Sequence, residues 1–205
     1  MAVFFTSDLH LGHRSILSIR PMFSDINEHD AFLIQRWNKK VTNKDDVYIL
    51  GDLSFRAEKP VSLYLSQLKG RKHLIVGNHD GHWMKQVQDM SVYFESVDYL
   101  KIIRHEKKQI TLCHYPMLEW PGSRYVESGT SFLIHGHIHN ETRSGVYDYI
   151  SKNQPHAFNA GVDINGFEPV SFEELKENNR RWYDQTAGVD AENATKPVVP
   201  NDMHL

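Results

Sequence analysis

The sequence predicts an α/β fold in which two β-sheets pack together and helices cover their outer faces. Three observations lead to this prediction. In the first half of the chain, short apolar runs alternate with stretches of helical periodicity, whereas the second half places strand-like runs next to one another. The runs are continuously apolar, which is typical of strands buried on both faces. Five of the runs, finally, end directly in Asp, Asn or His residues.

The first half of the chain predicts three strands with helices between them. Pro21 ends the first helix because proline removes a backbone donor, and apolar residues at helical spacing from Ala31 to Trp37 indicate the second. Pro60 and Gly70 delimit the third, in keeping with the preferences of helix ends. We expect strands at residues 2–7, 47–50 and 74–76, and helices at residues 13–19, 28–40, 60–68 and 82–90.

The second half predicts strands that pair directly. Residues 99–104 and 109–113 are expected to form a hairpin, and further elements follow as strands at residues 132–134 and 157–162 and a helix at residues 171–181. A chain of 205 residues fits one domain, which we place at residues 1–184. Residues 185–205 lack periodicity, and we expect them to form a C-terminal tail.

The composition excludes several classes of function. The formal net charge of −3 gives no general attraction to nucleic acid or to an anionic membrane. The single cysteine rules out an intrachain disulfide and suits a reducing compartment. No segment is long and apolar enough to cross a bilayer, and the N-terminus lacks the pattern of a secretory signal. We therefore expect a cytoplasmic enzyme with neither nucleic acid nor membrane as a partner, and the sequence leaves its oligomeric state open.

Residues with metal-ligating side chains follow the five apolar runs. In open α/β sheets, ligands bind beyond the carboxyl ends of the strands, so these side chains are expected to converge on one polynuclear metal site. Nitrogen and oxygen ligands of this kind suit Mn, Fe, Zn, Ni or Co better than calcium, and we expect two divalent ions, manganese first among them. The candidate ligands are Asp8, His10, Asp52, Asn78, His114, His137 and His139.

A phosphate ester is the substrate class that such a site suits. Two divalent cations about 3.5–4 Å apart can clamp the phosphate oxygens and supply a bound hydroxide near neutral pH. Asp52 is suited to bridge the two ions, because the preceding Gly51 permits a tight turn. Asp8 and His10 are alternate residues on a segment expected to be extended and can reach one ion together. His139 would join them, and the second ion would take Asn78, His114 and His137.

His79 is left over from this assignment and is predicted to be the general acid. It lies next to a candidate ligand and can protonate the leaving oxygen, which contributes about 10²–10⁴ in rate. Asp80 has two readings: it orients His79 and raises the pKa of that imidazole, or it caps the following helix. His13 likewise either faces the phosphate or serves the entry of a helix.

The ordered blocks resemble the calcineurin-like metallophosphoesterase superfamily over roughly residues 1–170. They are DxH, GD, GNHD, a lone His and GHxH, and the phrases SDLHLGH and NAGVDINGFEPVSFEEL are most similar to its small bacterial and phage branch. The resemblance implies a four-layer α/β/β/α sandwich of two mixed sheets and two-metal hydrolysis of a small phosphoester. It also implies that the substrate is a phosphodiester, such as a cyclic or nucleotide-derived one, ahead of a phosphomonoester. The alternative to an enzyme is a non-catalytic metal-binding scaffold of the same fold.

One departure from the family pattern narrows the subclass. Protein phosphatases of the superfamily carry GDxxDR, whose second Asp pairs with the catalytic histidine, whereas this chain has Phe55 at that place. Arg56 keeps the spacing of the motif, and its guanidinium fork matches phosphate oxygens. The departure therefore weakens the phosphoprotein interpretation and keeps Arg56 as a candidate for substrate binding.

Several residues keep open readings. The long loop that follows His114 either forms a lip over the substrate, as long loops near a site often do, or packs into the core through its aromatic residues, Tyr115, Trp120 and Tyr125. Asp163 is either a partner of a metal ligand or structural, and His135 is expected to point away from the site. The remaining histidines considered are expected at the surface or in helices without a metal role: His29, His73, His82, His105 and His204.

Overall fold

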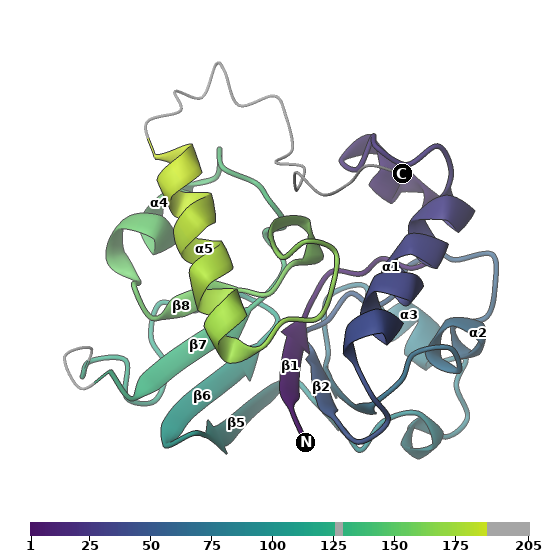
Figure 1. The fold of residues 1–205 in the computed structure, drawn as a ribbon, viewed down its shortest axis with the longest axis horizontal. Helices are drawn as coiled ribbons and strands as arrows, with labels where there is room; N and C mark the ends of the chain where they lie inside the picture. The colour runs from purple at the N-terminus through teal and green to yellow at the C-terminus, as the bar shows by residue number, and fades with distance from the viewer. Residues whose placement is uncertain (126–128, 188–205) are drawn as a thin grey trace.

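Two four-stranded sheets packed face to face form the centre of the molecule, as the computed structural model shows for residues 1–125 and 129–187 (Figure 1). The strand order is β1-β2-β3-β4 in the first sheet and β5-β6-β7-β8 in the second. Helices α1, α2 and α3 lie beside the first sheet, and α4 and α5 lie beside the second. The predicted α/β class, with two sheets between helices, is confirmed.

The first sheet is parallel and the second is mixed. Strands β1 to β4 all run in the same direction, while β5 pairs antiparallel with β6, which is parallel to β7 and β8 beyond it. The predicted hairpin is therefore confirmed, and β4 is a strand that the sequence did not predict. The strands are β1 (Val3–Thr6), β2 (Asp46–Ile49), β3 (Arg71–Ile75), β4 (Ser96–Asp98), β5 (Leu100–His105), β6 (Lys108–Cys113), β7 (Ser131–His135) and β8 (Ala157–Asn159).

Most of the predicted helices lie where they were expected, but several differ from the prediction in length. The first predicted helix is a short 3-10 helix, and α4 was not predicted at all. The last helix continues to Thr186, two residues into the predicted tail, whereas residues 188–205 lie outside the described residues. The helices are η1 (Arg14–Ser18), α1 (Ile26–Lys40), α2 (Val61–Leu65), α3 (Asp80–Met84), η2 (Met90–Val92), α4 (Gly145–Asn153), η4 (Val162–Ile164) and α5 (Phe172–Thr186).

Apolar side chains fill the layers on both sides of each sheet. Between the sheets, Phe5 and Ile75 of the first sheet pack with Leu112 and Ile134 of the second. On the outer face of the first sheet, Trp37 and other residues of α1, α2 and α3 form a separate core. This burial on both faces explains why the strand sequences are continuously apolar. It also leaves the strand ends as the place where polar side chains gather.

The carboxyl ends of strands from both sheets meet at one edge of the sandwich. An isolated parallel bridge joins Ser7, just beyond β1, to Gly161, just beyond β8. The backbone of Gly136, just beyond β7, donates to the carbonyl of His114, just beyond β6. Strand ends of the second sheet are thus tied together and to the end of β1, which brings the five motif blocks to the same edge. Within the described ranges, no helix combines the length and the apolar character that crossing a membrane requires.

Candidate metal centre

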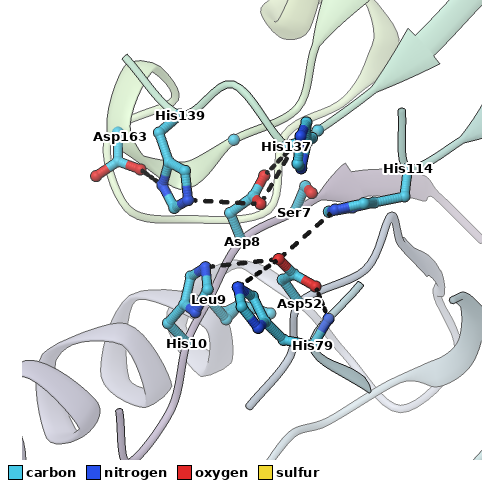
Figure 2. A network of polar contacts seen from close by, with 12 residues as sticks. Ser7, Asp8, Leu9, His10, Asp52, His79, His114, His137, His139 and Asp163 are labelled. Carbon is cyan, nitrogen blue, oxygen red and sulfur yellow. Dashed lines mark hydrogen bonds and ion pairs between the residues drawn. The ribbon is translucent and has the colours of Figure 1, made fainter. Parts of the chain in front are cut away.

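The first group of candidate ligands comprises Asp8, His10 and His139. Their ligand atoms all lie within 4.8 Å of one another, and Nε2 of His139 is 3.8 Å from Oδ1 of Asp8. Asp8 and His10 are buried, and they follow β1, whereas His139 follows β7. Figure 2 shows the imidazole of His139 directed at the carboxylate of Asp8. Two segments far apart in the sequence therefore converge on one place, as the strand-end pattern predicts.

A second group shares Asp8 and adds Asp52 and His114, again with all ligand atoms within 4.8 Å. Oδ2 of Asp52 lies 3.5 Å from Nε2 of His114 and 3.8 Å from Nε2 of His10, so this oxygen lies between the two groups (Figure 2). That position suits the predicted bridge. Because Asp8 is a member of both groups, the structure places two carboxylates, not one, where they can face both ions.

Asn78 and His137 lie beside the second group. Oδ1 of Asn78 is 3.0 Å from Nε2 of His114, and the ring centroids of His137 and His114 are 5.2 Å apart. The backbone N–H of His137 donates to Oδ2 of Asp8 at 3.0 Å, which fixes the turn from which its exposed imidazole projects. All seven predicted ligands are thus brought to one region.

The backbone reaches this arrangement through left-handed conformations. Asp8 and His10 were expected on an extended segment, and this expectation is wrong: their φ angles are +58° and +52°. Asp and His tolerate this region better than most residues, but each such position still costs about 1–3 kcal/mol. Five of the seven candidate ligands have positive φ: Asp8, His10, Asp52, His137 and His139. The strain is therefore concentrated where the side chains must converge.

The hydrogen bonds and the burial of the histidine rings fit a metal centre. Nδ1 of His114 donates to the Leu50 carbonyl at 2.7 Å, and Nδ1 of His139 donates to Asp163 at 2.9 Å, so the Nε2 atom of each ring faces a carboxylate. Burial alone would lower the pKa of His139, but the carboxylates of Asp8 and Asp163 raise it above its usual value. Nε2 of His10 is buried and has no hydrogen-bond partner among the described residues. Burial lowers the pKa of His10 well below its usual value, with further lowering by His139. Neutral imidazoles with a free Nε2 are what a divalent ion requires.

The predicted general acid, His79, lies at the edge of this centre. Its Nε2 is 3.8 Å from Oδ2 of Asp52, its backbone N–H donates to Oδ1 of the same carboxylate at 2.9 Å, and its side chain is 31% exposed. The ring of Phe55 packs against it with centroids 4.1 Å apart. An aromatic face therefore occupies the place where a GDxxDR motif would offer a carboxylate. His79 combines contact with the centre and access from outside.

The family model of the calcineurin-like phosphoesterase superfamily domain matches residues 1–162. The chain belongs to the calcineurin-like phosphoesterase superfamily. The resemblance inferred from the five motif blocks is thereby confirmed. The implied sandwich of two sheets flanked by helices is confirmed with it, except that the first sheet is parallel and only the second is mixed. Proteins of this family are typically metal-dependent, in agreement with the two ligand groups.

Three relatives extend the family match. The chain is 36% identical over 162 residues to the Gene 66 protein of Mycobacterium phage L5, across 66% of this chain and 76% of that protein. It is 30% identical over 175 residues to an uncharacterized protein of Methanocaldococcus jannaschii, across 83% and 87% of the two chains. The crystal structure of a protein of unknown function from Aquifex aeolicus is similar at 28% identity and a TM-score of 0.62, covering 85% of this chain and 97% of that one.

In this calcineurin-like phosphoesterase, Asp80 makes neither of the two contacts that the sequence suggested, with the His79 ring or with the backbone of the following helix. Its Oδ2 accepts from the backbone N–H of Asp52 at 2.9 Å and of Gly77 at 2.8 Å, and its Oδ1 accepts from the N–H of Leu53 at 3.0 Å and from the indole of Trp83 at 2.8 Å. Asp80 therefore neither orients His79 nor caps the backbone of α3. It ties the loop after β2 to the loop after β3.

The two residues predicted to contact the phosphate lie next to the centre. Nδ1 of His13 is 3.2 Å from Nδ1 of His10, so His13 supports a candidate ligand, and its ring also packs at 5.2 Å on that of Phe55. Arg56 is exposed, and its guanidinium lies over the Phe55 ring at 4.9 Å. Phe55 thus stands at the centre of a small aromatic and cationic wall beside His79.

Residues of the long loop and of the HGHIH block divide between site and core. Tyr115 is exposed, and its ring contacts the rings of both His114 (5.1 Å) and His137 (4.8 Å), so it borders the metal centre. Trp120, in contrast, is buried in a core cluster on the outer side of the second sheet. His135 is fully buried, and its Nδ1 donates to the Gly136 carbonyl; burial lowers its pKa to about 4. As predicted, it is no part of either ligand group.

The residues that lie behind the metal centre were not recognised as its support from the sequence. His29 was expected at the surface or in a helix without a metal role; it lies in α1, where it is fully buried and hydrogen-bonded to Arg20, which is fully buried as well. Asp163 was left between two readings, and the structure makes it the partner of His139. Burial alone would raise the pKa of Asp163, but the Arg20 guanidinium and His139 hold it well below its usual range.

Proposed function

We propose that this protein hydrolyses a small phosphodiester at a two-metal centre, with His79 as the general acid. The observation that carries this proposal is the position of His79. Its Nε2 lies 3.8 Å from the carboxylate between the two ligand groups, while about a third of its side chain is exposed. A structural histidine at such a place would be expected to be buried and held by hydrogen bonds at its ring. A proton donor instead needs access to both the reacting centre and the solvent.

The ligand groups fit two divalent ions, manganese being the first to test. Asp8, His10 and His139 would hold one ion, and Asn78, His114 and His137 the other, with Asp52 between them. When bound, such a pair neutralises the phosphate oxygens and lowers the pKa of water towards neutrality. The protein supplies the rest: His13 supports His10, and Asp52 accepts the backbone N–H that holds His79 in place.

The charges around the centre support a diester over a monoester. A phosphomonoester is a dianion near neutral pH, so its recognition gains more from nearby cations than that of a diester, which carries one charge. Arg14 is paired with Glu58 at 2.8 Å, and Arg20 is buried among its own acceptors. Of the three arginines Arg14, Arg20 and Arg56, which lie in the segments after β1 and β2, Arg56 is the one left to face a substrate. The apolar rings of Phe55 and Tyr115 beside the centre suit the second ester group.

Activity on two model substrates tests the proposal. Wild-type protein reconstituted with Mn²⁺ should hydrolyse bis-p-nitrophenyl phosphate with a higher kcat/KM than p-nitrophenyl phosphate, because the site offers few cations for a dianion. Release of p-nitrophenolate is read at 405 nm, and Zn²⁺, Ni²⁺, Co²⁺ and Fe²⁺ are compared in parallel. A preference for the monoester would replace the diesterase by a phosphomonoesterase. Tight binding of metal without turnover of either substrate would favour a scaffold.

A further inference from the structure

A guanidinium lies fully buried directly behind the first ligand group. Arg20, in the segment between η1 and α1, is 0% exposed, and all five of its N–H groups have acceptors. Nε and one terminal nitrogen form a fork on the carboxylate of Asp163, at 2.7 and 2.9 Å. A buried charge is tolerated only when it is compensated in this way, so this residue is held in a single geometry.

Two contacts of Arg20 hold the backbone that presents Asp8. Its terminal nitrogens donate to the carbonyl of Asp8 at 2.7 Å and to the carbonyl of Leu9 at 3.0 Å. Asp8 has a φ of +58°, a conformation that a non-glycine residue keeps only when its surroundings impose it. The guanidinium supplies this constraint by holding the backbone carbonyl of Asp8, while the backbone N–H of His137 holds the side-chain carboxylate at 3.0 Å.

A third contact reaches His139 through Asp163. The Oδ2 atom of Asp163 accepts both from Arg20 at 2.9 Å and from Nδ1 of His139 at 2.9 Å. Figure 2 shows Asp163 on the far side of the His139 ring from Asp8. A carboxylate at this position fixes the tautomer and the orientation of a ligating imidazole. One guanidinium thus acts on two members of the same ligand group, through η4 on one side and through the turn after β1 on the other.

Helix α1 anchors the guanidinium in turn. Nε2 of His29 accepts from Arg20 at 2.8 Å, and Nδ1 of His29 donates to Asp30 at 2.9 Å. Both oxygens of Asp30 lie 3.0 Å from the backbone N–H of Gly12, which belongs to the loop that carries His10. The chain of contacts therefore starts and ends on the first metal loop and passes through the buried face of α1.

We propose that Arg20 is the positioning residue of the Asp8, His10 and His139 group, and that with Asp163 it sets the affinity for the ion bound there. This inference rests on the proposed two-metal function. The two ions should depend on Arg20 to different extents. The contacts of Arg20 reach Asp8 and, through Asp163, His139 of the first group, whereas the second group shares only Asp8 with them. Loss of the guanidinium fork should therefore empty one site before the other. A lysine cannot replace it, since a single ammonium lacks the fork that serves Asp163 and the carbonyls together.

Metal binding to the folded protein tests this inference. Mn²⁺ titration of metal-free wild type, Arg20→Lys and Asp163→Asn by calorimetry should show two ions in the wild type. In each variant, one of these ions should bind about 10–100-fold more weakly. The other ion, which shares only Asp8 with this network, should lose clearly less affinity. The electron paramagnetic resonance signal of a coupled Mn²⁺ pair should give way to that of isolated Mn²⁺ at one equivalent. Leu65→Ala, a fully buried change in α2 away from the centre, is the matched control: it should lower the melting temperature and leave both affinities unchanged.

Each other outcome decides against the inference in a recognisable way. Wild-type affinities for both ions in folded Arg20→Lys and Asp163→Asn would show that the network is structural only. An equal loss at both sites would do the same, as would an equal loss in Leu65→Ala. If Arg20→Lys does not fold, as loss of a buried ion-pair partner can cause, the isosteric Asp163→Asn decides alone. A wild type that binds no ion at all would instead overturn the proposed function, and this inference with it.

Discussion

Asp52→Asn should abolish the pairing of the two ions and lower turnover by at least about 100-fold. The carboxylate lies between His10 at 3.8 Å and His114 at 3.5 Å, so an amide at this position removes a negative charge shared by both groups. Changes to outer partners of metal ligands already cost about 10–100-fold, and Asp52 is placed closer than those. Metal content by mass spectrometry and hydrolysis of bis-p-nitrophenyl phosphate should therefore fall together.

The substitution keeps the local fold and has a matched control. The asparagine oxygen can still accept the N–H of His79, which Oδ1 of Asp52 accepts at 2.9 Å. Asp46→Asn changes the same residue type at the other end of β2, where Asp46 pairs with Arg71 at 2.7 Å, and should leave metal content and turnover unchanged. Two firmly bound ions with near-normal turnover in Asp52→Asn would refute the central position of this carboxylate.

His79→Gln should lower turnover by about 10²–10⁴ for substrates whose leaving group needs a proton, with metal content unchanged. The effect should be small for p-nitrophenolate, which leaves readily as an anion, and large for a diester of an aliphatic alcohol. The comparison of the two leaving groups separates loss of an acid from loss of the site. Glutamine cannot donate a titrating proton, yet it fills a similar space beside Phe55.

The neighbouring histidine provides the control for this prediction. His82 is exposed on α3, and its ring centroid lies 6.1 Å from that of Phe55. The histidine of this segment that approaches the Asp52 carboxylate is His79. His82→Gln should leave both rates at the wild-type value. Equal losses on the two leaving groups in His79→Gln, or no loss on either, would remove His79 from the role of general acid.

The strand-end pattern predicted the location of the site, but it did not predict the backbone conformation that builds the site. Buried parallel strands must end at one edge of the sheet, so the convergence of Asp8, Asp52 and His137 follows from the pattern alone. The left-handed backbone at these residues does not follow from it. Glycine at a position points to a positive φ, whereas Asp and His only tolerate it, and the surrounding hydrogen bonds decide.

The support behind the centre could not be predicted, because its partners are remote in sequence. Arg20 and Asp163 are 143 residues apart, and neither belongs to a motif block of its own. The spacing of apolar residues on helix α1 shows which face of the helix is buried. For a histidine on that face, however, the sequence does not show whether the ring packs against apolar side chains or is hydrogen-bonded to a buried cation. Only the tertiary structure makes His29 and Arg20 neighbours.

Helix α4 was missed for a different reason. It has nine residues, and isolated helices shorter than about 12–15 residues are marginal in water. Its stability comes from packing: Tyr147 contacts Trp182 of α5, and Ile150 joins the cluster that contains Leu133 of β7. Its nine residues are also fewer than the roughly 11–18 over which helical periodicity can be recognised, so its apolar positions alone did not identify it.

The number of bound ions that hydrolysis requires distinguishes a two-metal centre from any other use of these ligands. Metal-free protein is titrated with Mn²⁺ while bound ions and the rate of bis-p-nitrophenyl phosphate hydrolysis are measured in the same samples. Two ligand groups that share Asp8, with Asp52 between them, predict that the rate stays low up to one bound ion per chain and rises as the second ion binds. Full activity with one ion, or activity that persists after chelation removes both, would contradict the account.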